Sequence, residues 1–341
     1  MIIALTGAKK NIGDFLIADR GIKLLRHYVD DDVVELDRFK SLDDQLEMVN
    51  QSRAVVLCGG PAYAENVYPG IYPLVEPLSR IQSPIVPFGL GWCGRPIDEP
   101  GEFSFTPEAL EFLEGAHAKI ESSSVRDSIT LDILGRHGLG NVAMTGCPVW
   151  YDLRFIGTPF AGSRSIESIV FTTPDNPKMI PQVLKALRVV RDCFPDAKIV
   201  SSFHRGIASD RYTSQKAAMG YRAMVWGAKA LGISSVDVAY DLDRINFYED
   251  FDLHVGYRVH AHLHFLSRRS PSVLLCEDGR GVGMVGGLAM EPIRAWDPDV
   301  IDRLRDKLQT ERSSGWRESA VAVDKIEETL PTMAGFLASI R

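Results

Sequence analysis

The stretch Phe251-Asp-Leu-His-Val-Gly-Tyr-Arg-Val-His-Ala-His-Leu-His264 passes from an apolar strand directly into a helix. Strand character runs to about Tyr257, and the apolar residues after it favour a helix. Short apolar runs followed by turns and then by helical segments recur along the rest of the chain, from residues 1–7 to residues 272–276. This alternation predicts an α/β fold with mostly parallel sheets covered by helices.

The length of the chain indicates more than one domain. A chain of 341 residues is longer than a single hydrophobic core usually supports. The strand–helix pattern breaks between residues 150 and 168, a polar stretch that contains Gly157, Pro159, Gly162 and Ser163, and then restarts. We therefore expect two doubly wound, Rossmann-like halves that face each other, joined by a linker in this stretch.

Composition limits which binding partners and which cellular compartment we expect for this protein. The 38 Lys and Arg residues against 45 Asp and Glu residues give a net charge of −7, so a nucleic-acid partner is not expected. The five cysteines are odd in number and widely spaced, which predicts free thiols in a reducing cytoplasm. No apolar run is long enough for a transmembrane span. Transient association with a membrane surface and self-association are left open.

The turn after the quoted strand is the strongest candidate for a ligand site. Ligands of parallel sheets bind beyond the carboxyl ends of the strands, where helix N-termini favour anions. Arg258 would add a fork for phosphate or carboxylate, and His260 would add a proton that titrates near neutral pH. The plain structural alternative is equally compatible with the spacing: Arg258 pairs with a nearby acid and His260 caps the helix.

The histidines of this stretch do not predict a metal site. Alternate residues on a helix diverge by about 200°, so His260, His262 and His264 do not converge on one ion. His260 and His264 are four residues apart, but no H-E-x-x-H pattern accompanies them.

Other strand-to-helix turns carry weaker signals. Asn11 and Asp14 are suited to capping a helix or to contacting a sugar hydroxyl. Gly59 and Gly60 permit close backbone approach in a turn after the third strand. His204 follows another strand and is placed to reach the same edge of the sheet.

The segment Ser124-Val-Arg-Asp127 lies where a strand passes into a helix. Asp127 is expected to cap the helix that begins near Ile129. Arg126 is expected to project from the turn toward a cleft, and the plain alternative is a surface arginine beside a capping aspartate.

Taken together and in order, these motifs resemble the polysaccharide pyruvyl transferase family. The resemblance spans about residues 5 to 280, and its most specific elements are V-R-D and G-x-R-x-H. The matching pieces are Asn11-Ile-Gly-Asp14, Gly59-Gly60, Gly89-Leu-Gly91, Val125-Arg-Asp127, Thr145-Gly-Cys-Pro148, Gly256-Tyr-Arg-Val-His260 and Pro271-Ser-Val-Leu-Leu275.

The resemblance implies a fold and an activity. Members of the family resemble two-domain GT-B enzymes, with the active site in the interdomain cleft. They move the enolpyruvyl group of phosphoenolpyruvate onto two sugar hydroxyls, which leaves a pyruvate ketal and phosphate. Neither a redox cofactor nor an obligatory metal is implied. The expected domains are residues 1–152 on the acceptor side and 153–310 on the phosphoenolpyruvate side, with helices in 311–341 crossing back.

Site roles follow from the same resemblance. Arg258 and Arg126 would clamp phosphoenolpyruvate, and His260 would be the acid and base. Further substrate contacts are assigned to Asn11, Asp14, Gly59, Gly60 and His204. The chain departs from the family pattern at Lys10 and Pro61, where glycine is more frequent, and these departures bear on acceptor choice and on activity.

Two other functions stay open at this point. A GT-B glycosyltransferase with a nucleotide-sugar donor would use Glu277 or Asp278, just after a strand, to bind a ribose. A non-enzymatic sugar- or phosphate-binding protein would not need a histidine beside two arginines. The sequence leaves open the acceptor sugar, its hydroxyl pair, and whether the acceptor is free, polymeric, lipid-linked or nucleotide-linked.

Overall fold

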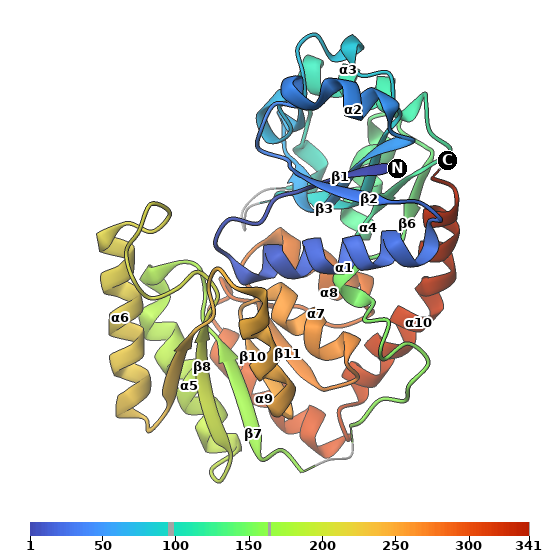
Figure 1. Ribbon diagram of the computed structural model, residues 1–341. Coiled ribbons are helices and arrows are strands. Elements are labelled where there is room, and N and C mark those ends of the chain that lie inside the picture. The colour runs from blue at the N-terminus through green and yellow to red at the C-terminus, as the bar shows by residue number, and fades with distance from the viewer. Residues whose placement is uncertain (95–98, 163–164, 341) are drawn as a thin grey trace. The chain divides into compact units, whose positions relative to one another are not determined.

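Two parallel six-stranded sheets, each in its own unit of the chain, form the fold of this computed structural model (Figure 1). The structure describes residues 1–94, 99–162 and 165–340, and Ser163 of the predicted linker lies outside these ranges. Unit 1 comprises Met1–Gly7, Ile17–Tyr151 and Ile326–Arg341, and unit 2 comprises Ala8–Leu16 and Asp152–Lys325.

The strand order in each sheet is that of a doubly wound fold. The first sheet has the order β2-β1-β3-β4-β5-β6, with every neighbouring pair parallel. Its strands are β1 (Ile2–Thr6), β2 (Val33–Asp37), β3 (Ala54–Tyr63), β4 (Ile85–Trp92), β5 (Ser123–Val125) and β6 (Val142–Met144). The helices between and after them are α1 (Ile12–Tyr28), α2 (Leu46–Gln51), α3 (Pro107–His117) and α4 (Ser128–Arg136).

The second sheet has the order β12-β11-β10-β7-β8-β9, again with parallel neighbours. Its strands are β7 (Ser168–Thr172), β8 (Lys198–Phe203), β9 (Ser234–Asp237), β10 (Leu253–Gly256), β11 (Ser272–Cys276) and β12 (Ile293–Arg294). The helices are α5 (Ile180–Cys193), α6 (Gln215–Ala230), α7 (Val259–Ser267), α8 (Gly279–Gly287), α9 (Val300–Ser313) and α10 (Arg317–Ala338). The direction of winding reverses between β7 and β10, which is the point where doubly wound sheets bind ligands.

The central strands of each sheet are buried and mostly apolar, as parallel sheets require. In unit 1 all five residues of β1 are buried. In unit 2 alternate residues such as Phe171 and Val255 pack with α5, α6 and α9 in one core. His254 points to the opposite face, where it lies near His262 of α7. The predicted α/β class with two doubly wound halves is therefore confirmed.

The structure corrects the predicted turn at Gly59 and Gly60. Both glycines lie inside β3, which continues to Tyr63, although their φ angles are +65° and +88°. Pro148 explains the need for glycine at position 89 in β4, and Ile17 explains it at position 59. A Cβ on Gly89 would lie 2.6 Å from the Pro148 ring, and one on Gly59 would lie 2.2 Å from Ile17 and 3.8 Å from the same ring.

Two further features differ from expectation. Helix α8 was not predicted because five of its nine residues are glycine, which favours a loop by propensity alone. Residues 8–16 group with unit 2, whereas the sequence pattern counts them with the first half. The boundary between the units also falls within α10, since Ile326–Arg341 groups with unit 1.

Candidate functional site

Four strands of the second sheet each end next to a charged residue. Asp175 lies beyond β7, Arg205 beyond β8, Arg258 beyond β10 and Glu277 directly after β11. The strand order β11-β10-β7-β8 makes these four strand ends neighbours. The charges therefore meet at the carboxyl edge of the sheet, around its topological switch point. We call these four residues the Arg258 cluster.

Arg258 is the central cation of this cluster. Its side chain is 12% exposed, with Nη2 3.5 Å from Asp175 Oδ1 and Nη1 3.9 Å from Glu277 Oε2. Arg205 Nη1 lies 2.8 Å from the other oxygen of Asp175. Glu277 Oε1 also accepts the backbone N–H of Asp175 at 2.9 Å. Arg258 thus pairs with nearby acids, as the plain structural alternative predicts. The same arrangement places two guanidinium groups, those of Arg258 and Arg205, at the carboxyl edge of the sheet.

The two carboxylates of the cluster respond differently to this setting. Burial opposes ionisation of Asp175, but Arg258 and Arg205 outweigh it and hold the pKa of Asp175 below its ordinary value. Burial raises the pKa of Glu277, and the attraction of Arg258 offsets only part of this effect. The cluster therefore contains one firmly ionised acid and one acid that is biased toward its protonated form.

Two histidines adjoin the cluster. His260 is the second residue of α7, and a Cβ on Gly13 would lie 2.8 Å from its Nδ1. His204 is fully buried, and its Nε2 lies 2.8 Å from the Tyr248 hydroxyl. Burial, followed by the positive charge of Arg258, holds the pKa of His204 well below its ordinary value. His260 does not cap α7, because Arg258 occupies the N-cap position.

A buried polar chain fixes the backbone at Arg258. Thr172 Oγ1 accepts the backbone N–H of Arg258 at 3.1 Å and lies 2.8 Å from His254 Nε2. His254 Nδ1 and His262 Nδ1 each lie 2.7 Å from the Ser272 hydroxyl. Gly256 allows this close approach, because a Cβ at its φ of +145° would lie 2.4 Å from the Thr172 carbonyl oxygen. His262 is thus a packing residue, as its place on the helix predicts.

The loop that carries Asn11 and Asp14 is part of unit 2 and is hydrogen-bonded within it. The N–H of Ile12 donates to the His204 carbonyl at 3.2 Å. Asn11 Oδ1 accepts the N–H of Gly13 at 3.3 Å, and Asn11 Nδ2 donates to Asp14 Oδ1 at 3.2 Å. These bonds hold the start of α1 and show Asn11 in the capping role that its position predicts.

Lys10 anchors this loop. Its side chain is only 2% exposed and lies 2.6 Å from Asp210 Oδ2. It also donates to the Thr213 hydroxyl at 2.5 Å, and its carbonyl accepts the N–H of Tyr240 at 2.9 Å. Lys10 therefore adds side-chain contacts to the backbone bond of Ile12 in holding this loop within unit 2.

Arg126, Gly59 and Gly60 belong to unit 1 and lie apart in the sequence from the groups just described. Arg126 is 1% exposed and donates to the Trp92 carbonyl at 3.2 Å, so the prediction that it projects from its turn is wrong. Its guanidinium lies over Gly91, where a Cβ would clash with Nε. Asp127 caps α4 by accepting the N–H of Thr130, as predicted.

The sequence did not single out Asp175. Its signal is the segment Thr172-Thr-Pro-Asp175, an acid just beyond a buried strand. Glu277 stood out at a strand end, but nothing in the sequence alone indicated that it faces Arg258, or that Arg205 and Arg258 share Asp175. That information lies in the strand order.

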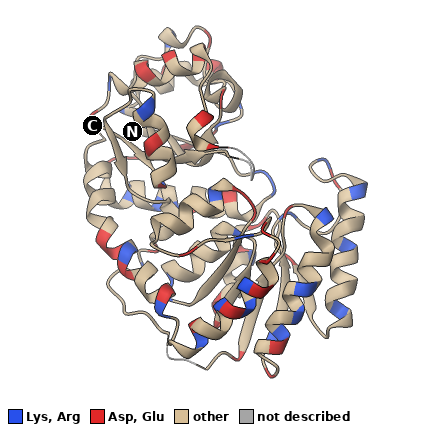
Figure 2. Ribbon diagram, turned by 180° about the vertical axis from the view of Figure 1, so that it is seen from behind, with Lys and Arg blue, Asp and Glu red and all other residues tan. Residues whose placement is uncertain are grey.

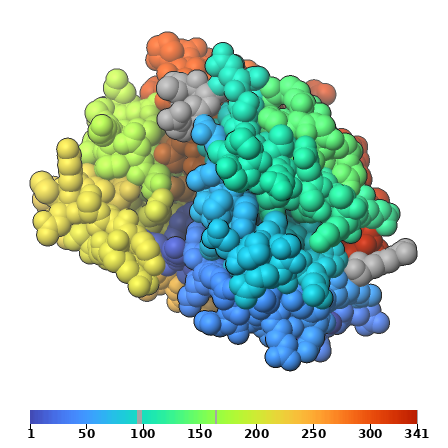
Figure 3. All heavy atoms as spheres, turned by 90° about the horizontal axis from the view of Figure 1, so that it is seen from above, coloured from blue at the N-terminus to red at the C-terminus, as the bar shows by residue number. Residues whose placement is uncertain are grey.

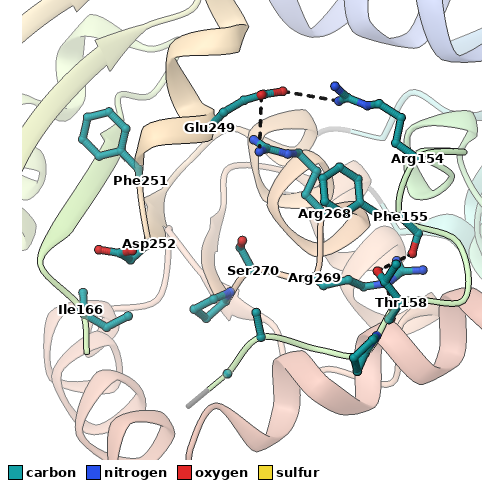
Figure 4. A pocket seen from close by; sticks show the side chains of 14 residues that line it. Arg154, Phe155, Thr158, Ile166, Glu249, Phe251, Asp252, Arg268, Arg269 and Ser270 are labelled. Carbon is teal, nitrogen blue, oxygen red and sulfur yellow. Dashed lines mark hydrogen bonds and ion pairs between the residues drawn. The ribbon is translucent and has the colours of Figure 1, made fainter. Parts of the chain in front are cut away.

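A cavity of about 360 Å³ lies at the other edge of the second sheet (Figure 4). Arg154 and Arg268 flank the ring of Phe155, each 5.5 Å from its centroid, and both approach Glu249. Arg154 also makes a two-point pair with Asp152. Ligands of doubly wound sheets bind at the carboxyl ends of the strands, so we place the candidate site at the Arg258 cluster and not at this cavity.

The described ranges contain neither a cluster of metal ligands nor a membrane-spanning helix. No group of three His, Cys, Asp or Glu side chains there could hold a metal ion. Outside the gaps at 95–98 and 163–164, no helix is both long and apolar enough to cross a membrane. All five cysteines are free thiols, as predicted.

The family profile described as polysaccharide pyruvyl transferase matches residues 11–216, which is more than half of the chain. A search of curated protein sequences gave no significant match. Among solved structures, one titled as Staphylococcus aureus MnaA with UDP is 15% identical, with a TM-score of 0.56, and the match covers 94% of this chain and 90% of that one.

Two further solved structures are similar over nearly their whole length. A UDP-GlcNAc 2-epimerase from Neisseria meningitidis bound to UDP-GlcNAc is 10% identical with a TM-score of 0.55, and the match covers 97% of this chain and 100% of that one. A protein described as a UDP-N-acetylglucosamine 2-epimerase from Listeria monocytogenes is 13% identical, with a TM-score of 0.53. The match covers 95% of this chain and 93% of that one. At these identities the likeness shows the fold, and it agrees with two Rossmann-like halves.

Proposed function

Because this chain belongs to the polysaccharide pyruvyl transferase family, we propose that it transfers the enolpyruvyl group of phosphoenolpyruvate to two hydroxyls of a sugar. The products are a pyruvate ketal and phosphate. The observation that carries the proposal is the position of Arg258, which lies with a second guanidinium and beside His260 at the switch point of a doubly wound sheet.

The Arg258 cluster is suited to a donor with both a phosphate and a carboxylate. Arg258 and Arg205 supply two planar forks, and forks of this kind bind such oxyanions at two points. In the structure Asp175 and Glu277 occupy these forks at distances between 2.8 and 3.9 Å. The donor anion would take over part of these contacts. The resemblance also assigns a guanidinium to Arg126, but within unit 2 the second guanidinium is that of Arg205.

The reaction needs a proton delivered to carbon C3 of the donor. Protonation of C3 makes C2 electrophilic, one sugar hydroxyl adds to C2, phosphate leaves, and the second hydroxyl closes the ketal. Of the two hydroxyl protons, one replaces the proton given to C3 and the other departs with phosphate. His204 is held neutral, so it is a poor initial donor. We assign the acid and base role to His260.

The acceptor is assigned to the loop that contains Asn11 and Asp14. This loop contacts His260 through Gly13, so a sugar hydroxyl bound there would lie near the proton donor. Gly59 and Gly60 stay predicted acceptor contacts of unit 1. The acceptor class follows from the family name: a polysaccharide or its precursor.

A glycosyltransferase with a nucleotide-sugar donor is the competing function. Two of the similar structures contain UDP or UDP-GlcNAc, which keeps this alternative in view. In this chain, however, the predicted ribose ligand Glu277 already accepts the N–H of Asp175 and faces Arg258. A ribose bound there would have to compete with both contacts.

The direct test is incubation of the protein with phosphoenolpyruvate and a panel of free, nucleotide-linked and lipid-linked sugars. The expected result is phosphate release that depends on one acceptor, with a product heavier by one pyruvate less one water. Parallel reactions with UDP- and GDP-sugars serve as the comparison. Glycosyl transfer from a nucleotide-sugar, with no phosphate released from phosphoenolpyruvate, would establish the competing function instead.

A further inference from the structure

Helix α6 has an exposed face of unusual composition. Lys216, Met219, Arg222, Trp226 and Lys229 are all exposed, and their spacing of three or four residues places them on one side of the helix. Trp226 is 72% exposed and Met219 is 68% exposed, the two largest values among the bulky hydrophobic side chains of the described residues. We call these five residues the α6 face.

The opposite side of α6 explains why this face is presented to solvent. Ala218, Tyr221, Met224 and Ala228 are buried and belong to the core of unit 2 or pack against it. The fold therefore fixes the helix with the α6 face outward. Figure 3 shows the yellow segment that contains α6 on the outer surface.

The charge around α6 is opposite to that of the whole chain. The chain has a net charge of −7, yet residues 211–236 contain no Asp or Glu. Figure 2 shows only basic charged positions along this helix. Neighbouring α5, whose Leu184 lies against Gly227, adds the exposed residues Lys185 and Arg188. Basic residues are thus concentrated on one edge of an acidic protein.

We propose that the α6 face docks on the surface of an anionic lipid bilayer. Lysine and arginine near such a surface are attracted by its negative potential. A tryptophan between them would lie at the headgroup level, where its ring is favoured. A protein partner fits less well, because the cores of protein interfaces are depleted in lysine, whereas here Lys216 and Lys229 lie on the same face as the two apolar side chains.

Docking through α6 would also bring the Arg258 cluster close to the membrane surface. Tyr221, on the inner side of α6, donates its hydroxyl to the Asp175 carbonyl at 2.7 Å. One helix, about 10 Å in diameter, therefore separates the proposed docking surface from the cluster. The docking surface itself does not depend on which reaction the cluster catalyses.

The test is co-sedimentation of the full chain with vesicles at low salt. Vesicles of phosphatidylcholine with phosphatidylglycerol should bind the protein, and vesicles of phosphatidylcholine alone should not. Replacing Lys216, Arg222 and Lys229 together by glutamine should weaken binding by about 100-fold. The matched control replaces Lys40 and Lys119, two exposed lysines of unit 1, and should leave binding unchanged.

A second measurement identifies the inserted side chain. Brominated lipids quench tryptophan that reaches the acyl boundary, and we expect quenching that is lost in Trp226→Phe and kept in Trp296→Phe, the other well-exposed tryptophan. The proposal is overturned if anionic vesicles do not bind, if the triple replacement has no effect, or if quenching survives Trp226→Phe. Soluble polyglutamate that displaces the protein from the vesicles as effectively as added anionic vesicles do would also overturn the proposal. The α6 face would then be a site for acidic polymers.

Discussion

Arg258 lies between two carboxylates at the carboxyl edge of the second sheet, and this position sets what each replacement should do. Lysine keeps the charge but cannot present two parallel N–H groups to a phosphate or carboxylate. Arg258→Lys should therefore be nearly as damaging as Arg258→Ala, each lowering kcat/KM for phosphoenolpyruvate by about 30-fold or more.

Steady-state kinetics at saturating acceptor would measure this effect. Arg244→Lys is a suitable control, because Arg244 is half-exposed and lies 3.9 Å from Asp241 in the same unit. A lysine variant at position 258 that keeps most of the kcat/KM would show that charge alone, without the fork, binds the donor.

Two histidines of α7, His260 and His262, are expected to differ in role, the first in catalysis and the second in packing. His260→Ala should lower kcat by about 10²–10⁴-fold while changing the phosphoenolpyruvate Kd much less, as expected for a proton donor. His262 is buried against Ser272. His262→Ala should instead lower the free energy of unfolding by about 1–3 kcal/mol and leave kcat nearly unchanged.

The comparison needs kcat, the phosphoenolpyruvate Kd and urea unfolding for both variants. If His260→Ala loses activity only through Kd, His260 is an anion ligand and the proton comes from another group. The sequence identified His260 and His262 correctly as diverging, because two residues on a helix have a fixed angular offset. It could not show Asp175 beside Arg258, since 83 positions separate them and only the strand order brings them together.

At the level of elements, the loop between β1 and α1 depends on Lys10. The lysine is buried with Asp210 and Thr213 of unit 2, so its removal should release the loop. In Lys10→Met, amide hydrogens of residues 11–14 should exchange about tenfold faster or more, because a hydrogen-bonded charge pair is lost.

Hydrogen-exchange mass spectrometry would follow these amides, with Lys9→Met as the control at the exposed neighbouring position. Unchanged exchange in Lys10→Met would show that Asn11 and the backbone bonds hold the loop without the lysine. The sequence marked Lys10 as a departure from the family pattern, but its partners are about 200 residues away and were not predictable from local pattern.

Several element boundaries were predictable because they depend on local chemistry. Asp127 caps α4 as expected, and the apolar run 272–276 forms β11. Strand β3 continues through Gly59 and Gly60 to Tyr63, where the sequence predicts a turn. Glycine normally signals a turn, but here Gly59 and Gly89 lie inside β3 and β4, where they leave room for Ile17 and Pro148.

At the level of the whole molecule, three fully buried histidines set a pH dependence of stability. Burial lowers the pKa of His262 to about 3, and it also holds the pKa values of His204 and His254 well below the ordinary value. Below about pH 6.5 the unfolded chain binds protons at these sites and the folded chain does not. The free energy of unfolding should therefore decrease as the pH is lowered below about 6.5. The loss is up to about 1.4 kcal/mol for each histidine and each pH unit.

Urea unfolding at pH 7.5 and pH 5.5 would measure this loss. Glu277 and Glu311 act in the opposite direction, because their raised pKa values favour the folded state on acidification, but they are two carboxyls against three histidines. His262→Gln should reduce the pH dependence. Stability that is flat or increases between these pH values would contradict the assignment of neutral buried histidines.

The central claim is that unit 2 binds phosphoenolpyruvate through Arg258, and calorimetric titration tests it most directly. Phosphoenolpyruvate should bind the wild-type protein without acceptor and should stabilise it against unfolding by about 2.7 kcal/mol at 100 times its Kd. Binding should be lost in Arg258→Ala and kept in Arg244→Ala. UDP-GlcNAc that binds more tightly than phosphoenolpyruvate, or phosphoenolpyruvate binding that survives Arg258→Ala, would contradict the claim.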